Sequence, residues 1–446
     1  MKLFGTDGIR SKAGVAPLDE ATVSRIGAAL VRSLGVAAAV PRVLIGRDTR
    51  ESGVWIEQAL ARGLAAEGAG VTSAGIVPTP AVAYLTRAGR FDAGIVISAS
   101  HNPFDDNGIK VFSGRGEKLG ELLEASIERL VSELPPVRHP TVGALNPDRA
   151  LVAQYIAHLR EILSSAGPLR GSLLALDCAN GATAPLAPEL FRDLGFAQVT
   201  VGDRPDGRNI NLACGSTHLE AVRQRVLTHG ARLGIAFDGD GDRALFIDRH
   251  GALIDGDAVL LIAADDLRRN GRLRGNGVVA TVMSNVGLEL AMRERGIELV
   301  RAPVGDKYVM EEMIKRGLAI GGEQSGHVIF ADHLFTGDGM ATALHMLRIM
   351  AETGRELDEL AASLVTYPQV LVNVRVRDRV DYLAVPAIAA SIARVESRVK
   401  DQGRVLIRYS GTEPLLRIML EGQDHNEIRA WANEIADAVR ANLGEA

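Results

Sequence analysis

Cysteine is almost absent from this chain, which has only Cys178 and Cys214 among its 446 residues. Two cysteines are too few for a disulfide-stapled secreted scaffold and too few for a structural zinc site. Aromatic residues make up only 4%, and no stretch approaches the roughly 20 uninterrupted apolar residues of a membrane span. The N-terminus also lacks the apolar segment of an export signal. We therefore expect a cytoplasmic protein.

Neither sign of charge dominates the sequence. Lysine and arginine together number 50 against 55 aspartates and glutamates, which gives a formal net charge of −5. No overall field draws such a protein to nucleic acid or to anionic lipid, so any phosphate binding must come from local clusters. A Walker A motif is absent, and so is a Gly-x-Gly-x-x-Gly turn between a strand and a helix. Nucleotide binding therefore has no support.

The remaining composition is that of an ordinary globular protein, with 47% apolar and 24% charged residues. At about 150 residues per domain, the length predicts about three domains and accommodates two or four. Short apolar runs alternate with helical patterns in the first third, at residues 43–45, 55–66, 71–77 and 94–98. This alternation is typical of a mostly parallel sheet covered by helices, in which ligands bind beyond the carboxyl ends of the strands.

The alternating pattern starts again twice, and the last part of the chain differs. Strands are expected at 173–177, 233–237 and 244–247, then at 278–283, 298–301 and 318–320, and a linking helix at 149–164. After Tyr367-Pro368 the pattern predicts a strand at 370–376, a helix at 381–395, two strands around Ser410 and a terminal amphipathic helix. The fold class is thus α/β: three related domains with mixed, largely parallel sheets and a smaller C-terminal α+β domain. The expected boundaries are 1–150, 151–254, 255–367 and 368–446.

An acidic loop follows the expected strand at 233–237 and contains Asp238, Asp240 and Asp242, separated by glycines. At 4 Å and an effective dielectric constant of 20, each pair of carboxylates repels by about 4 kcal/mol, and a divalent cation removes this repulsion. Oxygen ligands favour Mg²⁺, Mn²⁺ or Ca²⁺ over zinc. An EF-hand is excluded because Arg243 stands at the glycine position and Arg249 at the final glutamate position. The alternative is a solvated acidic turn.

A serine loop, residues 98–103, follows another apolar run and reads Ser-Ala-Ser-His-Asn-Pro. A hydroxyl presented by a turn at the end of a buried strand, such as that of Ser100, is well placed for nucleophilic attack. The loop is not a Gly-x-Ser-x-Gly elbow, because Ser98 and Asn102 occupy the glycine positions. Serine, asparagine and proline are also ordinary turn residues, so a plain turn is an equal alternative.

Two further polar loops interrupt apolar runs. Residues 321–327 combine glycines with Glu323, Gln324, Ser325 and His327, a set of side chains suited to the hydroxyls of a sugar. Residues 408–417 offer guanidinium groups, hydroxyls and glycine-loosened backbone amides, which suit a phosphate dianion. Either loop could instead be a polar hairpin turn. Near the start, the aspartates of the Thr6–Arg10 and Gly46–Asp48 stretches are interpreted as structural ion-pair residues.

Taken together and in this order, these motifs resemble the α-D-phosphohexomutase family over essentially the whole chain. The serine, acidic and phosphate loops resemble the family in general. The members that act on amino-sugar phosphates are matched more specifically by Phe4-Gly5-Thr6-Asp7-Gly8-Ile9-Arg10, by Asn209-Ile210-Asn211-Leu212-Ala213-Cys214-Gly215-Ser216-Thr217-His218 and by Gly322-Glu323-Gln324-Ser325-Gly326-His327. Ser11 departs from the family pattern, which has glycine after the arginine.

The resemblance implies a four-domain enzyme with a central cleft, in which Ser100 carries a phosphoryl group and binds one Mg²⁺ per subunit together with Asp238, Asp240 and Asp242. It implies that sugar hydroxyls are held by Glu323 and Ser325, and that the phosphate not reacting is held by Arg408, Ser410, Gly411, Thr412 and Arg417. The groups expected to offset charge or to move the proton are Lys110, Arg10, Arg243 and His327.

The implied reaction interconverts glucosamine 6-phosphate and glucosamine 1-phosphate through a 1,6-bisphosphate, for cell-wall amino-sugar synthesis. The alternative is the same mechanism on mannose or glucose phosphates. A hypothesis of a different class is a non-catalytic protein that binds a divalent cation. The expected partner is a small sugar phosphate, with neither nucleic acid nor membrane, and a homodimer is expected only from the resemblance.

Overall fold

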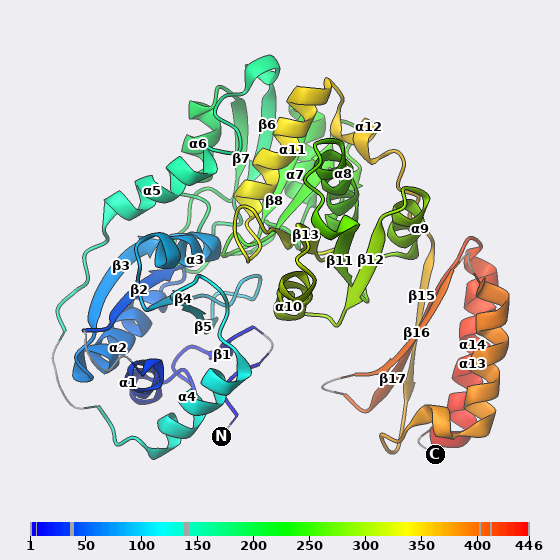
Figure 1. The fold of residues 1–446 in the computed structure, drawn as a ribbon, viewed down its shortest axis with the longest axis horizontal. Coiled ribbons are helices and arrows are strands. Elements are labelled where there is room, and N and C mark those ends of the chain that lie inside the picture. The colour runs from blue at the N-terminus through cyan, green and yellow to red at the C-terminus, as the bar shows by residue number, and fades with distance from the viewer. Residues whose placement is uncertain are drawn as a thin grey trace. The chain divides into compact units, whose positions relative to one another are not determined.

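The computed structural model describes residues 2–5, 7–35, 40–137, 142–400, 403–410 and 413–444. These residues divide into two compact units (Figure 1). The first consists of Met1–Met283 with Ile297–Ala362, and the second of Ser284–Gly296 with Ser363–Ala446. Among the described helices, none is long and apolar enough to cross a membrane.

The first unit contains three sheets. Its strands are β1 (Ile9–Lys12), β2 (Arg42–Arg47), β3 (Gly70–Ile76), β4 (Ala93–Ile97), β5 (Asp106–Ser113), β6 (Leu173–Asp177), β7 (Ala197–Val201), β8 (Leu233–Phe237), β9 (Ala244–Asp248), β10 (Leu253–Ile254), β11 (Gly277–Thr281), β12 (Glu298–Ala302), β13 (Ile320–Gly322) and β14 (Val328–Phe330). Its α-helices are α1 (Glu20–Leu34), α2 (Gly53–Ala66), α3 (Thr79–Ala88), α4 (Glu121–Glu133), α5 (Arg149–Leu159), α6 (Ala187–Asp193), α7 (Glu220–His229), α8 (Gly256–Arg269), α10 (Asp306–Arg316), α11 (Gly339–Thr353) and α12 (Leu357–Ala361). Two 3₁₀ helices, η1 (Gly167–Leu169) and η2 (Arg274–Asn276), complete it.

The three sheets share one arrangement. The strand orders are β1-β5-β4-β2-β3, β10-β9-β8-β6-β7 and β12-β11-β13-β14. In each sheet three strands are parallel, and the next strand after a tight loop returns antiparallel: β4 to β5, β8 to β9 and β13 to β14. The predicted fold class, three related α/β domains with mixed and largely parallel sheets, is confirmed. As a result, the serine loop, the acidic loop and the polar loop at residues 321–327 occupy equivalent positions in the three sheets.

Close helix packing supports the first sheet. A Cβ atom on Gly63 of α2 would lie 1.8 Å from the Ser24 carbonyl oxygen, and one on Gly27 of α1 would lie 2.5 Å from the Leu60 carbonyl oxygen. Only glycine permits this approach of the two backbones, which lie side by side in Figure 1. The helices bury apolar residues together with β2 and β4, so the strand that precedes the serine loop is anchored in a packed core.

Two predicted helices have different limits in the structure. The helix expected at 149–164 ends at Leu159. Beyond it, the backbone N–H groups of Glu161 and Ile162 donate to carbonyls three residues earlier, as in a 3₁₀ turn, and not four residues earlier, as in an α-helix. The helix expected at 381–395 begins only at Pro386 as α13 (Pro386–Val399), after a 3₁₀ turn, η3 (Tyr382–Ala384). Proline has no N–H to donate and is tolerated in the first turn of a helix but not in its interior.

The second unit is a small α+β body. It comprises α9 (Val286–Glu294), β15 (Gln369–Arg375), η3, α13, β16 (Arg404–Tyr409), β17 (Leu415–Glu421) and α14 (His425–Leu443). The sheet is antiparallel, in the order β15-β17-β16, and α13 and α14 pack against it. Ile428, Ile435 and Val439 of α14 are buried in that core, as the predicted apolar stripe requires.

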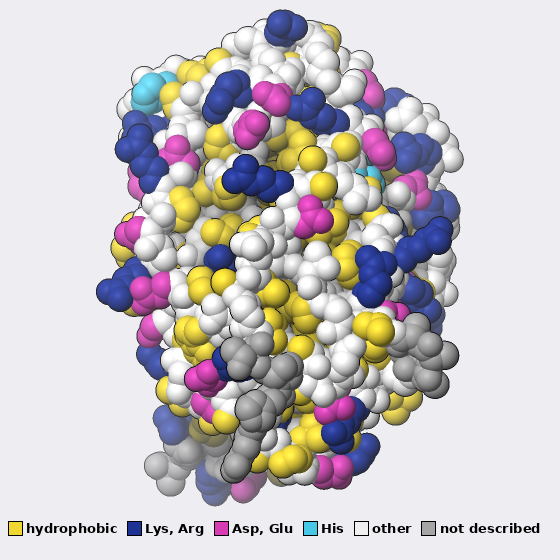
Figure 2. Space-filling model, turned by 90° about the vertical axis from the view of Figure 1, so that its left-hand side faces the viewer, with side chains coloured by type: hydrophobic (Ala, Val, Ile, Leu, Met, Phe, Trp, Pro, Cys, Tyr) yellow, Lys and Arg dark blue, Asp and Glu magenta, His cyan; other side chains and the backbone are white. Residues whose placement is uncertain are grey.

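Charges of both signs are dispersed over the face of the molecule in Figure 2, where lysines and arginines lie among aspartates and glutamates. This face shows no broad region of one sign. The observation agrees with the near-balanced composition and directs attention to local clusters.

Candidate active site

Three equivalent loops of the first unit carry most of the predicted site residues. Each loop joins an inner strand to the strand that pairs with it in antiparallel fashion. The β4–β5 loop carries Ser100, the β8–β9 loop carries Asp238, Asp240 and Asp242, and the β13–β14 loop carries Glu323, Ser325 and His327.

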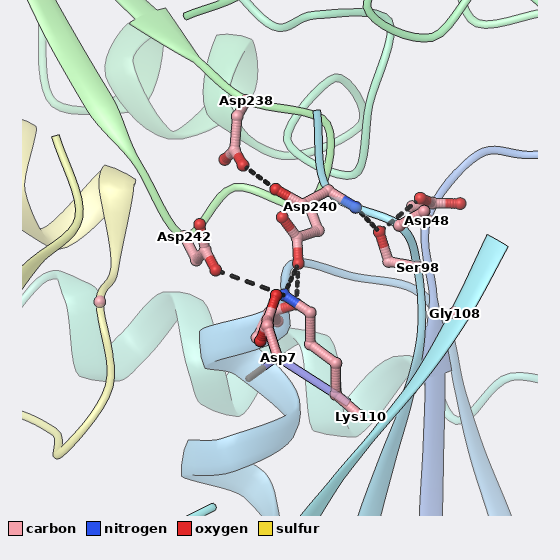
Figure 3. Close-up of polar contacts among 12 residues, drawn as sticks. Asp7, Asp48, Ser98, Gly108, Lys110, Asp238, Asp240 and Asp242 are labelled. Carbon is pink, nitrogen blue, oxygen red and sulfur yellow. Dashed lines mark hydrogen bonds and ion pairs between the residues drawn. The ribbon is translucent and has the colours of Figure 1, made fainter. Parts of the chain in front are cut away.

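Ser100 lies in direct contact with the acidic loop. Its side-chain hydroxyl donates a hydrogen bond to Oδ2 of Asp238 over 2.6 Å, and only 1% of the residue is exposed. Its backbone N–H donates to Oγ of Ser98 at 2.9 Å (Figure 3). The φ angle of Ser100 is +52°, in the left-handed region that serine uncommonly adopts. The chain thus holds this hydroxyl in a defined position against a carboxylate from another sheet.

The three aspartates of the acidic loop are buried and close together. One carboxylate oxygen from each lies within 4.8 Å of the others. Burial, together with the charges of Asp242 and Asp240, raises the pKa of Asp238 well above its ordinary value. Oδ1 of Asp240 and Oδ1 of Asp242 are buried and accept no hydrogen bond from any residue that the structure describes. Buried oxygens without donors are suited to a divalent cation, and an oxygen-only set favours Mg²⁺, Mn²⁺ or Ca²⁺.

Lys110 of β5 reaches into the acidic loop. Its Nζ atom lies 2.8 Å from Oδ2 of Asp240, 3.0 Å from Oδ2 of Asp7 and 3.5 Å from Oδ2 of Asp242 (Figure 3). Burial alone would lower the pKa of Lys110, but the three carboxylates raise it well above its ordinary value. The side chain is therefore a charged ammonium that offsets part of the negative charge of the loop.

His327 approaches the acidic loop from the third sheet. Its Nδ1 atom lies 3.6 Å from Oδ2 of Asp242, and its Nε2 atom lies 3.6 Å from Oδ2 of Asp306. The backbone N–H of Gly337 donates to Nε2 at 3.0 Å, which assigns the proton of the neutral ring to Nδ1. Burial would lower the pKa of His327, but Asp242 and Asp306 raise it above its ordinary value.

Two arginines add positive charge beside the serine and acidic loops. Arg10 forms an ion pair with Asp7 and donates to the Ala99 carbonyl at 3.4 Å. Arg243 donates its backbone N–H to Oδ1 of Asp238 at 3.1 Å. Burial would lower the pKa of Arg243, but the aspartates of the loop raise it, so its guanidinium stays charged.

A cavity of about 410 Å³, within the size range of small-molecule sites, is lined by some of these groups, namely Asp7, Arg10, Asp242, Arg243 and His327. It is lined by Leu3, Gly5, Asp7, Gly8, Arg10, His101, Asp242, Arg243, Val304, Gly305, Asp306, Glu323 and His327. Glu323 accepts a hydrogen bond from the backbone N–H of Gly305 at 3.1 Å and one from the Ser325 hydroxyl at 3.4 Å. Glu323, Ser325 and Arg243 also line a neighbouring cavity of about 580 Å³.

The predicted phosphate residues lie in the second unit, where Gly411 and Thr412 fall outside the described residues. Arg408 of β16 stands directly opposite Arg417 of β17 in the antiparallel register. This register places two guanidinium side chains next to each other on the sheet. Arg417 donates to the Ser410 hydroxyl at 3.3 Å and pairs with Glu413 at 3.2 Å.

Several cavity residues had no distinguishing signal in the sequence. Asp306, at the start of α10, and Lys118 form an ion pair, and Lys118 also lies 2.5 Å from Asp7. Asp7 is the ion-pair residue that the sequence indicated, and it lines the cavity as well. His101, next to Ser100, faces the same cavity. Asp7 and His101 stand inside motifs that the sequence singled out but were given no role at the site, whereas Asp306 and Lys118 have ordinary surroundings in the sequence.

The fold and the loops match one family over all four of its domains. Profiles described as phosphoglucomutase/phosphomannomutase match residues 1–136 (alpha/beta/alpha domain I), 153–251 (domain II), 255–367 (domain III) and 371–438 (C-terminal domain). The chain belongs to the phosphoglucomutase/phosphomannomutase family. The predicted family membership is therefore confirmed.

Individual relatives and solved structures are also similar to this chain over nearly its whole length. A protein of Solibacter usitatus named phosphoglucosamine mutase is 53% identical over 99% of each chain. One of Geotalea daltonii with the same name is 46% identical over 99% of this chain and 98% of its own. Among solved structures, a phosphoglucomutase/phosphomannomutase family protein from Burkholderia thailandensis is 27% identical, with a TM-score of 0.79 over 99% of each chain.

Proposed function

We propose that the chain acts as a phosphoglucosamine mutase, an isomerase that interconverts glucosamine 6-phosphate and glucosamine 1-phosphate. The observation that carries the proposal is the 2.6 Å contact between the Ser100 hydroxyl and Asp238, beside two buried carboxylate oxygens that accept no hydrogen bond within the described part of the chain. The full-length relatives named for this activity support the choice of substrate.

The proposed reaction moves one phosphoryl group at a time. In the active form, Ser100 carries the group as a phosphate ester. A free hydroxyl of the sugar monophosphate attacks phosphorus, the bond from phosphorus to Oγ breaks, and a bond to the sugar oxygen forms. The proton of the sugar hydroxyl passes to a base, and Oγ receives a proton as it leaves. The resulting 1,6-bisphosphate turns over in the cavity and returns its other phosphoryl group to Ser100 by the reverse steps.

The residues of the predicted site have proposed roles in these transfers. Arg10 and Arg243 would offset charge on the transferring phosphoryl group with their guanidinium groups. Lys110 and His327 are the members of the predicted set that can move a proton. Glu323 and Ser325 would accept from and donate to sugar hydroxyls. Arg408, Ser410, Gly411, Thr412 and Arg417 would bind the phosphate that does not react.

Asp238, Asp240 and Asp242 would hold Mg²⁺ together with an oxygen of Ser100. The bound ion would neutralise charge on the oxygens of the phosphoryl group while this group passes between Oγ of Ser100 and the sugar oxygen. The proposed identity rests on the oxygen-only donor set and on the two buried oxygens that accept no hydrogen bond from the described residues.

A coupled assay tests this proposal by comparing glucosamine, mannose and glucose 6-phosphates at equal concentrations with Mg²⁺. We expect the highest kcat/KM with glucosamine 6-phosphate. Preferred turnover of mannose or glucose phosphate would replace the substrate and keep the mechanism. Absence of turnover with all three would contradict the proposed function.

A further inference from the structure

Asn211 belongs to the motif at residues 209–218, to which the proposed chemistry assigns no role. It lies between β7 and α7, and only 7% of it is exposed. Its φ angle is +59°, and its backbone N–H donates to the Ala179 carbonyl at 2.8 Å. Asparagine tolerates this left-handed conformation better than most residues, so the side chain is held in a fixed direction.

The side-chain amide of Asn211 bonds to the serine loop of another sheet. Its Nδ2 atom donates to the Ser100 carbonyl at 2.8 Å and to the Asn102 carbonyl at 3.0 Å. The NH₂ group has two N–H donors, so both are used. The loop that carries the proposed nucleophile is therefore tied to the second sheet through these two carbonyls.

Arg50 donates to the same two carbonyls, but it belongs to the first sheet, as the serine loop does. Its Nη2 atom donates to the carbonyls of Ser100 and Asn102, both at 2.9 Å, and its Nε atom pairs with Asp48 at 2.8 Å. Arg50 and Asp48 are fully buried. The N–H, carbonyl and hydroxyl of Ser100 are thus all bonded, which stabilises its left-handed backbone.

The acidic loop passes through the same point. A Cβ atom on Gly239 would lie 2.4 Å from the Ser100 carbonyl oxygen and 2.8 Å from Nδ2 of Asn211. The two loops therefore meet where the Asn211 amide binds, immediately between Asp238 and Asp240 in the chain. A change in this amide would alter the spacing of the two loops.

We propose that Asn211 is a positioning residue that sets the Ser100 hydroxyl relative to the carboxylates of the acidic loop. This inference rests on the proposed function. Without the amide, the peptide group after Ser100 loses a donor from the second sheet, and among the described residues Arg50 remains as the side-chain donor to the Ser100 and Asn102 carbonyls. A displacement of about 1 Å in reacting groups can lower a rate about 100-fold. We therefore expect an effect on kcat and little effect on KM.

Three variants test the role. Asn211→Ala removes the donors, and Asn211→Asp keeps the shape but turns an oxygen towards two carbonyls. Asn180→Ala is the matched control, because Asn180 also has a positive φ angle, +47°, and its side chain bonds to Asn209 and to the Arg204 amide. If Asn211→Ala melts below the assay temperature, Asn211→Gly removes the same donors without left-handed strain and takes its place.

We expect kcat to fall about 10- to 100-fold in Asn211→Ala with KM nearly unchanged, and at least as far in Asn211→Asp. Asn180→Ala should keep both constants near those of the wild type. The inference is overturned if Asn211→Asp is as active as the wild type, if Asn211→Ala loses only thermal stability, or if Asn180→Ala loses kcat equally.

A second readout separates this inference from the proposed function. Intact-mass spectrometry follows transfer of a phosphoryl group from glucose 1,6-bisphosphate to Ser100 in each variant, and Asn211→Ala should be loaded more slowly. Loading of the wild type without turnover of glucosamine phosphates would overturn the proposed substrate alone. Neither loading nor turnover of a folded wild-type protein would overturn both.

Discussion

The hydroxyl of Ser100 lies 2.6 Å from a carboxylate oxygen of Asp238, although 138 positions of the chain separate the two residues. They follow β4 and β8, which occupy the same place in two sheets of the same strand order. The contact explains why a serine loop and an acidic loop, each a plausible turn by itself, belong to one site. Predictions about this site follow from its charges.

Removal of one carboxylate should weaken the response to metal. Asp240→Asn changes a proposed metal ligand that is 1% exposed. Substitution of residues that only hydrogen-bond to a metal's ligands already costs about 10- to 100-fold in metal affinity. We expect the Mg²⁺ concentration for half-maximal activity to rise at least ~100-fold. Asp105→Asn is the control, since this exposed carboxylate pairs only with Lys12 among the ion pairs of the described chain. Wild-type Mg²⁺ dependence in Asp240→Asn would remove the metal assignment.

Removal of the buried ammonium should make folding depend on metal. Lys110→Met leaves Asp7, Asp240 and Asp242 without their shared cation, and loss of one partner of a buried ion pair costs about 3–5 kcal/mol. We expect a lower melting temperature without Mg²⁺ and a larger upward shift on adding Mg²⁺ than in the wild type. Lys12→Met, which removes an exposed lysine, should melt like the wild type. An equal Mg²⁺ shift in Lys110→Met and the wild type would contradict this account.

The phosphate site proposed in the second unit from the motif at residues 408–417 can be tested through Arg417. A charged hydrogen bond contributes about 1.5–3 kcal/mol, so Arg417→Ala should raise KM for the sugar phosphate about 10- to 100-fold. Initial-rate kinetics measure this change, with kcat falling less than KM rises. Arg429→Ala, an exposed arginine of α14, serves as the control. An unchanged KM in Arg417→Ala would show that the phosphate binds elsewhere.

Both thiols should resist modification in the folded protein. Burial, followed by the charge of Asp177, raises the pKa of Cys214 to about 12 and the pKa of Cys178 further. The reactive thiolate is the deprotonated form, so the raised pKa lowers its population at neutral pH. A disulfide reagent at pH 7 should label neither cysteine until denaturant is added, when two thiols react. Rapid labelling of the native protein would show that this part of the second sheet opens.

The sequence predicted regular elements well where periodicity is strong. The strands expected at 173–177 and 233–237 coincide with β6 and β8 residue for residue, because each is a short run of buried apolar residues. The helix expected at 381–395 failed at its start, because the apolar period continues through Pro386 whereas the backbone hydrogen bonds do not.

The site residues likewise fall into those that local sequence patterns predicted and those that they did not. Ser100 and the aspartates of the acidic loop were selected from local patterns, since alternating glycine and aspartate or a serine turn is visible in a few residues. Asp306 and Arg50 were not selected, and Asn211 was quoted only within the motif at residues 209–218 without a role of its own. Each of the three contacts residues distant in the sequence, which no spacing rule identifies. The contact from Asn211 to Ser100 spans 111 positions and involves a backbone carbonyl, which leaves no trace in residue type.

Phosphorylation of Ser100 is the central claim, and intact-mass spectrometry tests it most directly. Wild-type protein and Ser100→Ala are incubated with Mg²⁺ and a hexose 1,6-bisphosphate, and the modified peptide is mapped. We predict one added phosphoryl group on Ser100 in the wild type, its loss when glucosamine 6-phosphate is supplied, and none in Ser100→Ala. Equal phosphorylation of the wild type and Ser100→Ala, or a wild-type turnover rate in Ser100→Ala, would contradict the account.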